Sequence, residues 1–175
     1  MLVTEGVLTR TVEDTARTLD LLAGYVTGDA NWAPPESAPF AQLAQRDPGK
    51  LRIGVIRQPP VDTTVDPLNL AGVDQTVALL EGLGHEVELI ELQLGELDLV
   101  EPFIKMWAVG VGLGASFGAL VGGKVPDAQT LEPLTLKLFE IGQSIGAVEY
   151  QQTEIFLLAL ARMMIVQFSQ FDAVL

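Results

Sequence analysis

The sequence predicts an α/β fold. A strand, a helix and a second strand follow one another over residues 50–90, which is the spacing of a crossover unit with two parallel strands. From residue 97 onward, apolar residues recur mostly at helical spacing. The 175 residues are enough for one compact domain with its own core. We therefore expect a small sheet covered by helices.

The first expected element is an amphipathic helix over residues 12–23. Thr11 is a suitable N-cap, Asp14 lies three residues further on, and Gly24 suits the end of the helix. Residues 27–49 then carry several Gly, Asp and Pro residues. We expect a long surface loop there, with one helical turn near residues 40–44.

The crossover unit comes next. Residues 50–56 are apolar enough for a buried strand, which a Pro-Pro pair ends. A helix is expected from Pro67 to about Leu83, followed by Gly84. Residues 86–90 alternate between charged and apolar side chains, which is typical of a half-buried strand.

The rest of the chain is predicted to be mostly helical. Helices are expected over residues 98–121, 130–142 and 147–170, and a strand over residues 171–175. That last strand has an apolar end, which indicates a cut or a strand whose partners lie elsewhere.

Composition excludes several kinds of site. The net charge is −13, and so acidic a surface repels phosphate backbones, which argues against a nucleic-acid partner. The absence of cysteine excludes disulfides and thiolate sites, and a single histidine argues against a histidine metal centre. We expect neither a metal nor a cofactor. The first residues lack a signal-peptide pattern, so a cytoplasmic location is the default expectation.

Glycines recur every four residues in the stretch 106–123, which carries no charge: they are Gly110, Gly114, Gly118 and Gly122. On a helix they form one smooth stripe that allows another backbone to approach closely. We favour a helix packed inside a larger soluble protein over a membrane span, for which the stretch is barely long enough. A dinucleotide loop is disfavoured, because no strand precedes these glycines.

Few residues are candidates for a binding or catalytic role. Phe103 and Trp107 stand just before the glycines, and such a cluster can line an apolar ligand pocket, although core packing is its commoner use. Ser116 and Ser144 each stand in a G-x-S-x-G sequence, at residues 114–118 and 142–146. Ser116 lies inside the expected Gly-rich helix and Ser144 just before an expected helix start, so neither sits on a strand-to-helix elbow. Spacing identifies no base beside any of the four serines. We assign no catalytic residue and no metal ligand.

A series of short motifs resembles one enzyme family. Residues 6–16 read GVLTRTVEDTA and resemble the G-P-L-x-R-T/S-V-x-D-x-A segment of amidase signature enzymes, with Val7 where the family usually has proline. The series continues in the family's order with LRIGV at 51–55, VDP at 65–67, LGHEV at 83–87 and FDAVL at 171–175. The resemblance covers about residues 6–90 and 147–175 and leaves the middle unmatched.

The resemblance implies a mixed β-sheet covered by α-helices and an enzyme that hydrolyses linear or cyclic amides. The family uses a Ser–cis-Ser–Lys triad in which a neutral lysine takes the proton and backbone N–H groups stabilise the oxyanion. Those family positions lie upstream of the segment at residues 6–16, so no residue here inherits them. Arg10 and Asp14 match family positions and are assigned structural roles.

From this resemblance we expect residues 1–175 to form a single partial domain, a portion of an amidase that supplies scaffold and part of the pocket for a small-molecule amide. The unmatched residues 98–146 are its variable helical segment. We expect it to be inactive alone, and to associate with the missing amidase segment or with itself. The alternative is a non-enzymatic interaction module, or a membrane-associated one, built on the helix with the glycine stripe.

Overall fold

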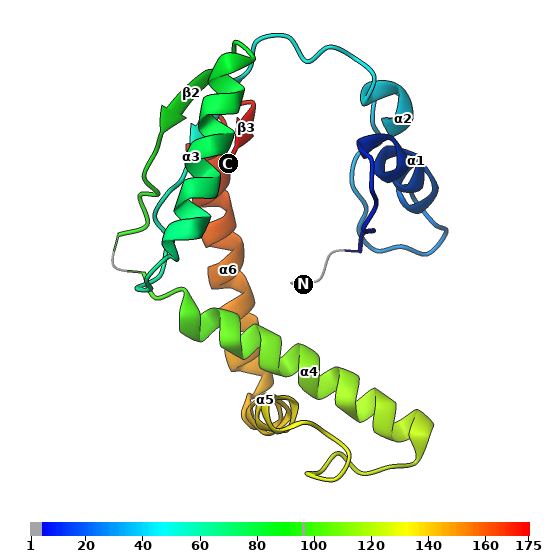
Figure 1. The fold of residues 1–175 in the computed structure, drawn as a ribbon. Helices are drawn as coiled ribbons and strands as arrows, with labels where there is room; N and C mark the ends of the chain where they lie inside the picture. Colours follow the sequence, from blue (N-terminus) through cyan, green and yellow to red (C-terminus); the bar gives the residue numbers. More distant parts are fainter. Residues whose placement is uncertain (1–4, 96) are drawn as a thin grey trace. The chain divides into compact units, whose positions relative to one another are not determined.

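The computed structural model describes residues 5–95 and 97–175 (Figure 1). The chain divides into two compact units. The N-terminal unit is Val3–Gly49 and the C-terminal unit runs from Lys50 to Leu175. The expectation of a single partial domain stays a prediction.

The N-terminal unit contains two helices, α1 (Val12–Leu22) and α2 (Phe40–Leu43). Thr11 caps α1 as expected, because its Oγ1 accepts a hydrogen bond of 3.0 Å from the N–H of Asp14. The carboxylate of Asp20 accepts bonds of 2.6 and 3.1 Å from the N–H groups of Phe40 and Ala41. One acidic side chain therefore ties the start of α2 to α1 across the long loop.

The C-terminal unit begins with the expected crossover: β1 (Arg52–Val55), α3 (Pro67–Gly82) and β2 (Glu86–Leu89). Asp66 caps α3 and Pro67 occupies its first turn, where a missing N–H costs nothing. The strands β1 and β2 are parallel, with Arg52 opposite Glu86. The crossover predicted from the sequence is therefore confirmed.

The third strand, β3 (Ala173–Val174), pairs with the other side of β1 and is also parallel. The sheet order is β2-β1-β3, so β1 is central. Hydrogen bonds extend the pairing beyond the two β3 residues, because Asp172 and Leu175 also bond to the backbone of β1. The fold class is α/β as expected, and the three strands found in residues 5–95 and 97–175 are all parallel.

Three helices lie between β2 and β3 in the sequence: α4 (Val100–Gly122), α5 (Pro133–Ser144) and α6 (Ala147–Phe168). Their bounds agree with the expected helices within a few residues. Gly123 ends α4 in the left-handed conformation, with φ of 65°. The helix α4 packs against both α5 and α6.

Few side chains are buried. In the C-terminal unit the buried apolar residues come from the sheet, from α4, α5 and α6 and from the loop before α4, and they are Ile53, Val55, Leu94, Met106, Ala108, Leu138 and Leu160. On β1, Gly54 leaves room for its neighbours, since a Cβ there would lie 2.8 Å from the side chain of Ile90 and 3.2 Å from that of Phe171. The core is therefore narrow and follows β1 and the helix contacts.

Candidate functional site

The aromatic pair proposed from the sequence lies on one face of α4. Phe103 and Trp107 are one turn apart, with ring centroids separated by 5.9 Å and ring planes inclined at 46°. Their exposed fractions are 47% and 42%, whereas Met106 beside them is buried. The pair is therefore an exposed aromatic surface on α4, and its role in lining a ligand pocket stays a prediction.

A cation between two carboxylates lies on another part of α4. The Nζ of Lys105 is 2.8 Å from Glu101 one turn before it and 2.9 Å from Glu149 on α6. These carboxylates border a shallow hollow of about 240 Å³, which Thr153 and Phe156 also line. The hydrogen bonds to Glu101 and then Glu149 raise the pKa of Lys105 above its ordinary value.

This geometry decides what Lys105 can do. A lysine that accepts a proton from a serine must be neutral when it acts. The two carboxylates stabilise the ammonium form of Lys105, so they oppose such a role. Lys105 instead joins α4 to α6.

The serine hydroxyls of the helices also have structural partners. Ser144 donates a bond of 2.7 Å to the carbonyl of Ile141, and Ser169 donates one of 2.8 Å to Val166. Ser116 accepts a bond of 3.4 Å from the side-chain amide of Gln143. These three bonds involve carbonyls and an amide, so the described geometry does not activate any of the three as a nucleophile.

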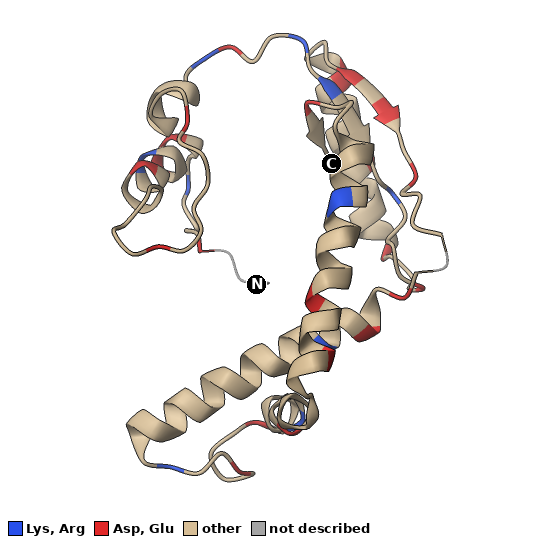
Figure 2. Cartoon of the chain, turned by 180° about the vertical axis from the view of Figure 1, so that it is seen from behind, with Lys and Arg blue, Asp and Glu red and all other residues tan. Residues whose placement is uncertain are grey.

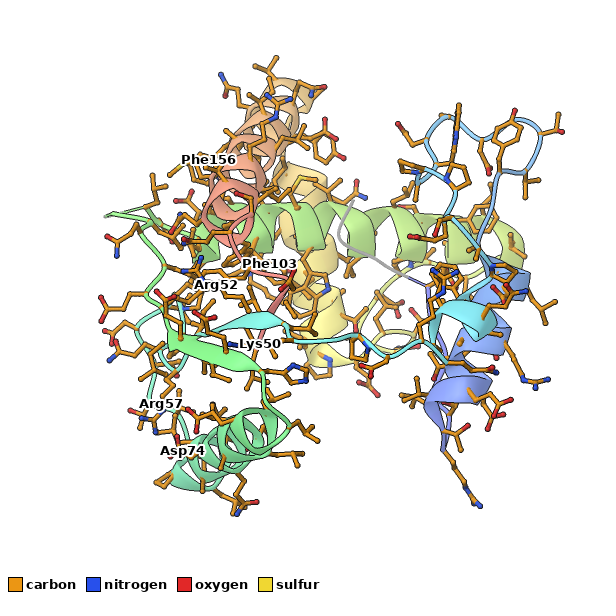
Figure 3. The ribbon with its side chains drawn as sticks, turned by 90° about the horizontal axis from the view of Figure 1, so that it is seen from above. Lys50, Arg52, Arg57, Asp74, Phe103 and Phe156 are labelled. Carbon is orange, nitrogen blue, oxygen red and sulfur yellow. The ribbon has the colours of Figure 1, made fainter. Side chains whose placement is uncertain are left out.

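A larger hollow of about 520 Å³ lies at the carboxyl ends of β1 and β2. Its lining includes Arg57, the Pro59-Pro60 pair and Leu89. The Arg57 Nη2 is 3.0 Å from the carboxylate of Asp74 on α3, and the two side chains lie together beside the strands (Figure 3). The carboxyl ends of parallel strands commonly bind ligands, so this hollow is the second candidate site.

At the opposite end of the same strands, Arg52 joins all three. The Nη2 atom of its guanidinium is 2.8 Å from the carboxylate of Glu88 on β2. The central carbon of the guanidinium, Cζ, lies 5.0 Å from the centre of the ring of Phe171, which stands just before β3. The hydrogen bond to Glu88 raises the pKa of Arg52. The backbone N–H of Arg52 donates a bond of 2.7 Å to Asp172. This cluster stabilises the sheet rather than presenting a free cation to a ligand.

The histidine is also engaged in the fold. His85 accepts a bond of 3.2 Å at Nδ1 from the N–H of Leu51, which links the end of α3 to the start of β1. Within residues 5–95 and 97–175, the structure brings together no group of three His, Asp or Glu side chains that could hold a metal ion.

Sequence reasoning located Phe103 and Trp107 but missed the hollow beside Arg57 and the bridge from Lys105 to Glu149. The Glu101–Lys105 spacing is visible in the sequence as a helical pair four residues apart. Glu149 lies 44 positions after Lys105, and only the packing of α6 on α4 brings it there. The predicted crossover unit could have indicated the hollow beside Arg57, because such a unit places the carboxyl ends of its two strands side by side.

Comparison with known proteins identifies the family. The family model described as Amidase matches residues 1–175. A putative amidase of Synechocystis sp. is 36% identical over 107 residues, which are 61% of this chain and 21% of that protein. A 6-aminohexanoate-cyclic-dimer hydrolase of a Pseudomonas species is 35% identical over 109 residues, covering 61% of this chain and 22% of that protein.

The fold has a counterpart among solved structures. A structure of 6-aminohexanoate cyclic dimer hydrolase superposes with a TM-score of 0.82 and 24% identity, over 93% of this chain and 34% of that one. This chain thus spans about a fifth of the length of these curated relatives and about a third of that solved structure. With the family model matched along all 175 residues, the chain belongs to the amidase family.

Proposed function

We propose that this chain is part of an amidase that hydrolyses carbon–nitrogen amide bonds by serine-based acyl transfer. The observation that carries the proposal is the family match over residues 1–175. In such a reaction a serine oxygen attacks the amide carbon, the C–N bond breaks, and the amine leaves with the proton that the base received. Water then releases the acid from the acyl-enzyme.

This chain supplies scaffold and part of the substrate pocket in the proposal. Lys105 is bound by two carboxylates, and the hydroxyls of Ser144 and Ser169 donate to backbone carbonyls. These contacts favour a nucleophile and base that come from polypeptide beyond these 175 residues. Association with that polypeptide, or self-association, belongs to the same proposal.

The substrate class in the proposal is a small amide, linear or cyclic. Two relatives are named for hydrolysis of the 6-aminohexanoate cyclic dimer. Phe103 and Trp107 offer an apolar wall suited to the carbon chain of such an amide. Amide substrates therefore remain the first class to assay.

The test uses a serine-directed fluorophosphonate on the amidase isolated from its source cells and on purified residues 1–175. We expect labelling of the longer polypeptide at a serine outside this chain and no turnover of aliphatic or aryl amides by the purified 175 residues. Labelling of Ser37, Ser116, Ser144 or Ser169 together with amide turnover by the short chain would contradict the proposal.

The pocket assignment has its own test in the active enzyme. Trp107→Ala and Phe103→Ala are expected to raise KM more than they lower kcat, because the rings contact the ground-state substrate. Phe117→Ala, an exposed aromatic further along α4, is the matched control. Equal effects of all three substitutions would place the substrate elsewhere.

A second candidate function is membrane association through α4. Of the described helices, α4 alone is long and apolar enough to cross a membrane by length and composition. Its contacts with α5 and the Lys105–Glu149 pair favour a packed helix instead. Liposome flotation of the purified chain distinguishes the two, since a packed helix leaves the chain in the soluble fraction.

A further inference from the structure

The helix α6 is apolar on two opposite sides. Its inner side contributes the buried Leu160, and beside it Thr153, whose hydroxyl donates a hydrogen bond to the carbonyl of Glu149. Its other side carries large apolar side chains that are between 58% and 73% exposed, and we call them the outer face: Val148, Ile155, Leu158, Ile165 and Val166. A surface helix usually keeps its large apolar side chains on the one side that faces the core, so a second apolar side indicates a further contact surface.

Charge is sparse along this helix. The charged residues of α6 are Glu149, Glu154 and Arg162, and most of the helix is uncharged in Figure 2. Arg162 follows Ile155 by seven residues and Leu158 by four, which puts it on the outer face. Within the described part of the chain it makes no ion pair and no side-chain hydrogen bond of its own.

The exposed area is too large for a protein of this mass. The chain exposes 13323 Å² and weighs 18.8 kDa. A compact monomer of that mass exposes about 8,300 Å², and two separately compact units of these lengths would expose about 9,800 Å². The difference of about 3,500 Å² or more exceeds the roughly 1,000–2,500 Å² that one partner contributes to an obligate interface.

We propose that the outer face of α6 is covered by a segment of the same amidase polypeptide that lies outside these 175 residues. The inference rests on the proposed function and assigns the surface at which the rest of the enzyme docks. The covering segment is apolar where it meets Ile155 and Val166. It places a carboxylate or carbonyl oxygen opposite Arg162.

The length of the relatives supports this occupant. About two thirds of the matched solved chain lies outside the part that these residues cover, since they span 34% of it. A second copy of this chain is less suitable, because each copy carries a net charge of −13 and like charges oppose close association. A membrane is disfavoured by Glu149, Glu154 and Arg162, which are spread along the helix.

The absence of cysteine makes a direct test simple. Ile155→Cys and, as a second variant, Leu158→Cys each introduce one thiol on the outer face. Lys137→Cys on α5, where the side chain is 68% exposed, is the matched solvent-facing control. Each variant is made in the native polypeptide, whose intact mass and amidase activity are recorded, and in the purified 175-residue chain. Peptide mass spectrometry then follows alkylation by iodoacetamide.

We expect both outer-face thiols to react at least about tenfold more slowly in the active native enzyme than in the isolated chain, because a covered site reacts only after local opening. Lys137→Cys should react rapidly in both. Rapid reaction of both thiols in the active enzyme would overturn the docking inference and leave the proposed function intact.

Slow alkylation of the two outer-face thiols in the isolated chain would distinguish the other possible occupants of this face. Slowing at every concentration would mean that the N-terminal unit covers the face, and slowing that grows with concentration would mean a second copy. Slowing only with added liposomes would mean a membrane. Any of the three overturns the inference. A native product of 18.8 kDa without amidase activity would overturn the proposed function as well.

Discussion

Two glycine-lined sides of α4 differ in what they contact. On one side, Gly112 lies against Gly142 of α5. A Cβ atom added at Gly112 would be 3.8 Å from the Cα atom of Gly142. On another, Gly110, Gly114, Gly118 and Gly122 have nothing within 4 Å of an added Cβ. Glycine spacing alone therefore does not identify a helix contact, because a smooth surface is necessary for close approach but does not provide a partner.

The packed side shows what close approach requires. A Cβ at Gly142 would clash with the carbonyl oxygen of Ala108 and lie 3.2 Å from the backbone nitrogen of Val109. Ala108 is completely buried. The open stripe borders a hollow of about 340 Å³ shared with Lys124 and Leu131. One side of α4 is thus complete within this chain, and the other is available to a partner.

The largest loss of stability is expected from Gly142→Ala. The new methyl group meets backbone atoms of α4, which cannot rotate away, so the helices must separate at a cost of about 1–3 kcal/mol. The better helix propensity of alanine offsets at most about 1 kcal/mol. Urea unfolding followed by circular dichroism measures the loss. A more stable Gly142→Ala chain would show that α4 and α5 do not cross here.

A smaller loss of stability than that of Gly142→Ala is expected from Lys105→Met, which changes a residue on the side of α4 that packs within this chain. Urea unfolding measures this loss as well. The substitution leaves the carboxylates of Glu101 and Glu149 without their shared cation. Lys124→Met, at the far end of α4, is the control.

The pH dependence of this loss has a definite sign. The pKa of Lys105 is raised in the folded chain, so its contribution is fully present below the unfolded value of about 10.4. The contribution decreases as pH rises above that value towards the higher folded pKa. The stability gap between the unsubstituted chain and Lys105→Met should therefore be constant near neutral pH and narrow in alkali. A gap that widens in alkali would contradict the ion-pair account.

The smallest effect is expected from Gly118→Ala on the open stripe. With nothing near the added methyl group, alanine should stabilise the isolated chain by up to about 1 kcal/mol through helix propensity. The same substitution in the native amidase sharpens the comparison. Destabilisation there, with stabilisation in the isolated chain, would mean that the stripe is covered in the native enzyme. Destabilisation of the isolated chain would contradict its open geometry.

Most of the secondary structure followed from local signals. Pro67 predicted the start of α3, and Thr11 predicted that of α1. These signals are local because a cap satisfies N–H groups within one turn. The strand at the end of the chain was expected, but its position beside β1 was not. It depends on a bond between Arg52 and Asp172, which are 120 positions apart.

The candidate site was less predictable than the fold. Phe103 and Trp107 are neighbours on one helix, so their proximity is a consequence of helical spacing. The role of Lys105 depended on Glu149, and the hollow beside Arg57 depended on two strand ends meeting. Such sites combine residues from elements that lie far apart in the sequence, and only the tertiary structure brings these elements together.

The sequence by itself determined the α/β class, the helix starts, the family resemblance and the acidic surface. Caps, periodicity and charge act over a few residues or over composition, and they can be read without a fold. Tertiary structure decided which glycines pack, that Lys105 is bound between two carboxylates, and that α6 exposes a second apolar side. These three features depend on which surfaces of the helices come into contact, and those contacts are made between residues that are distant in the sequence.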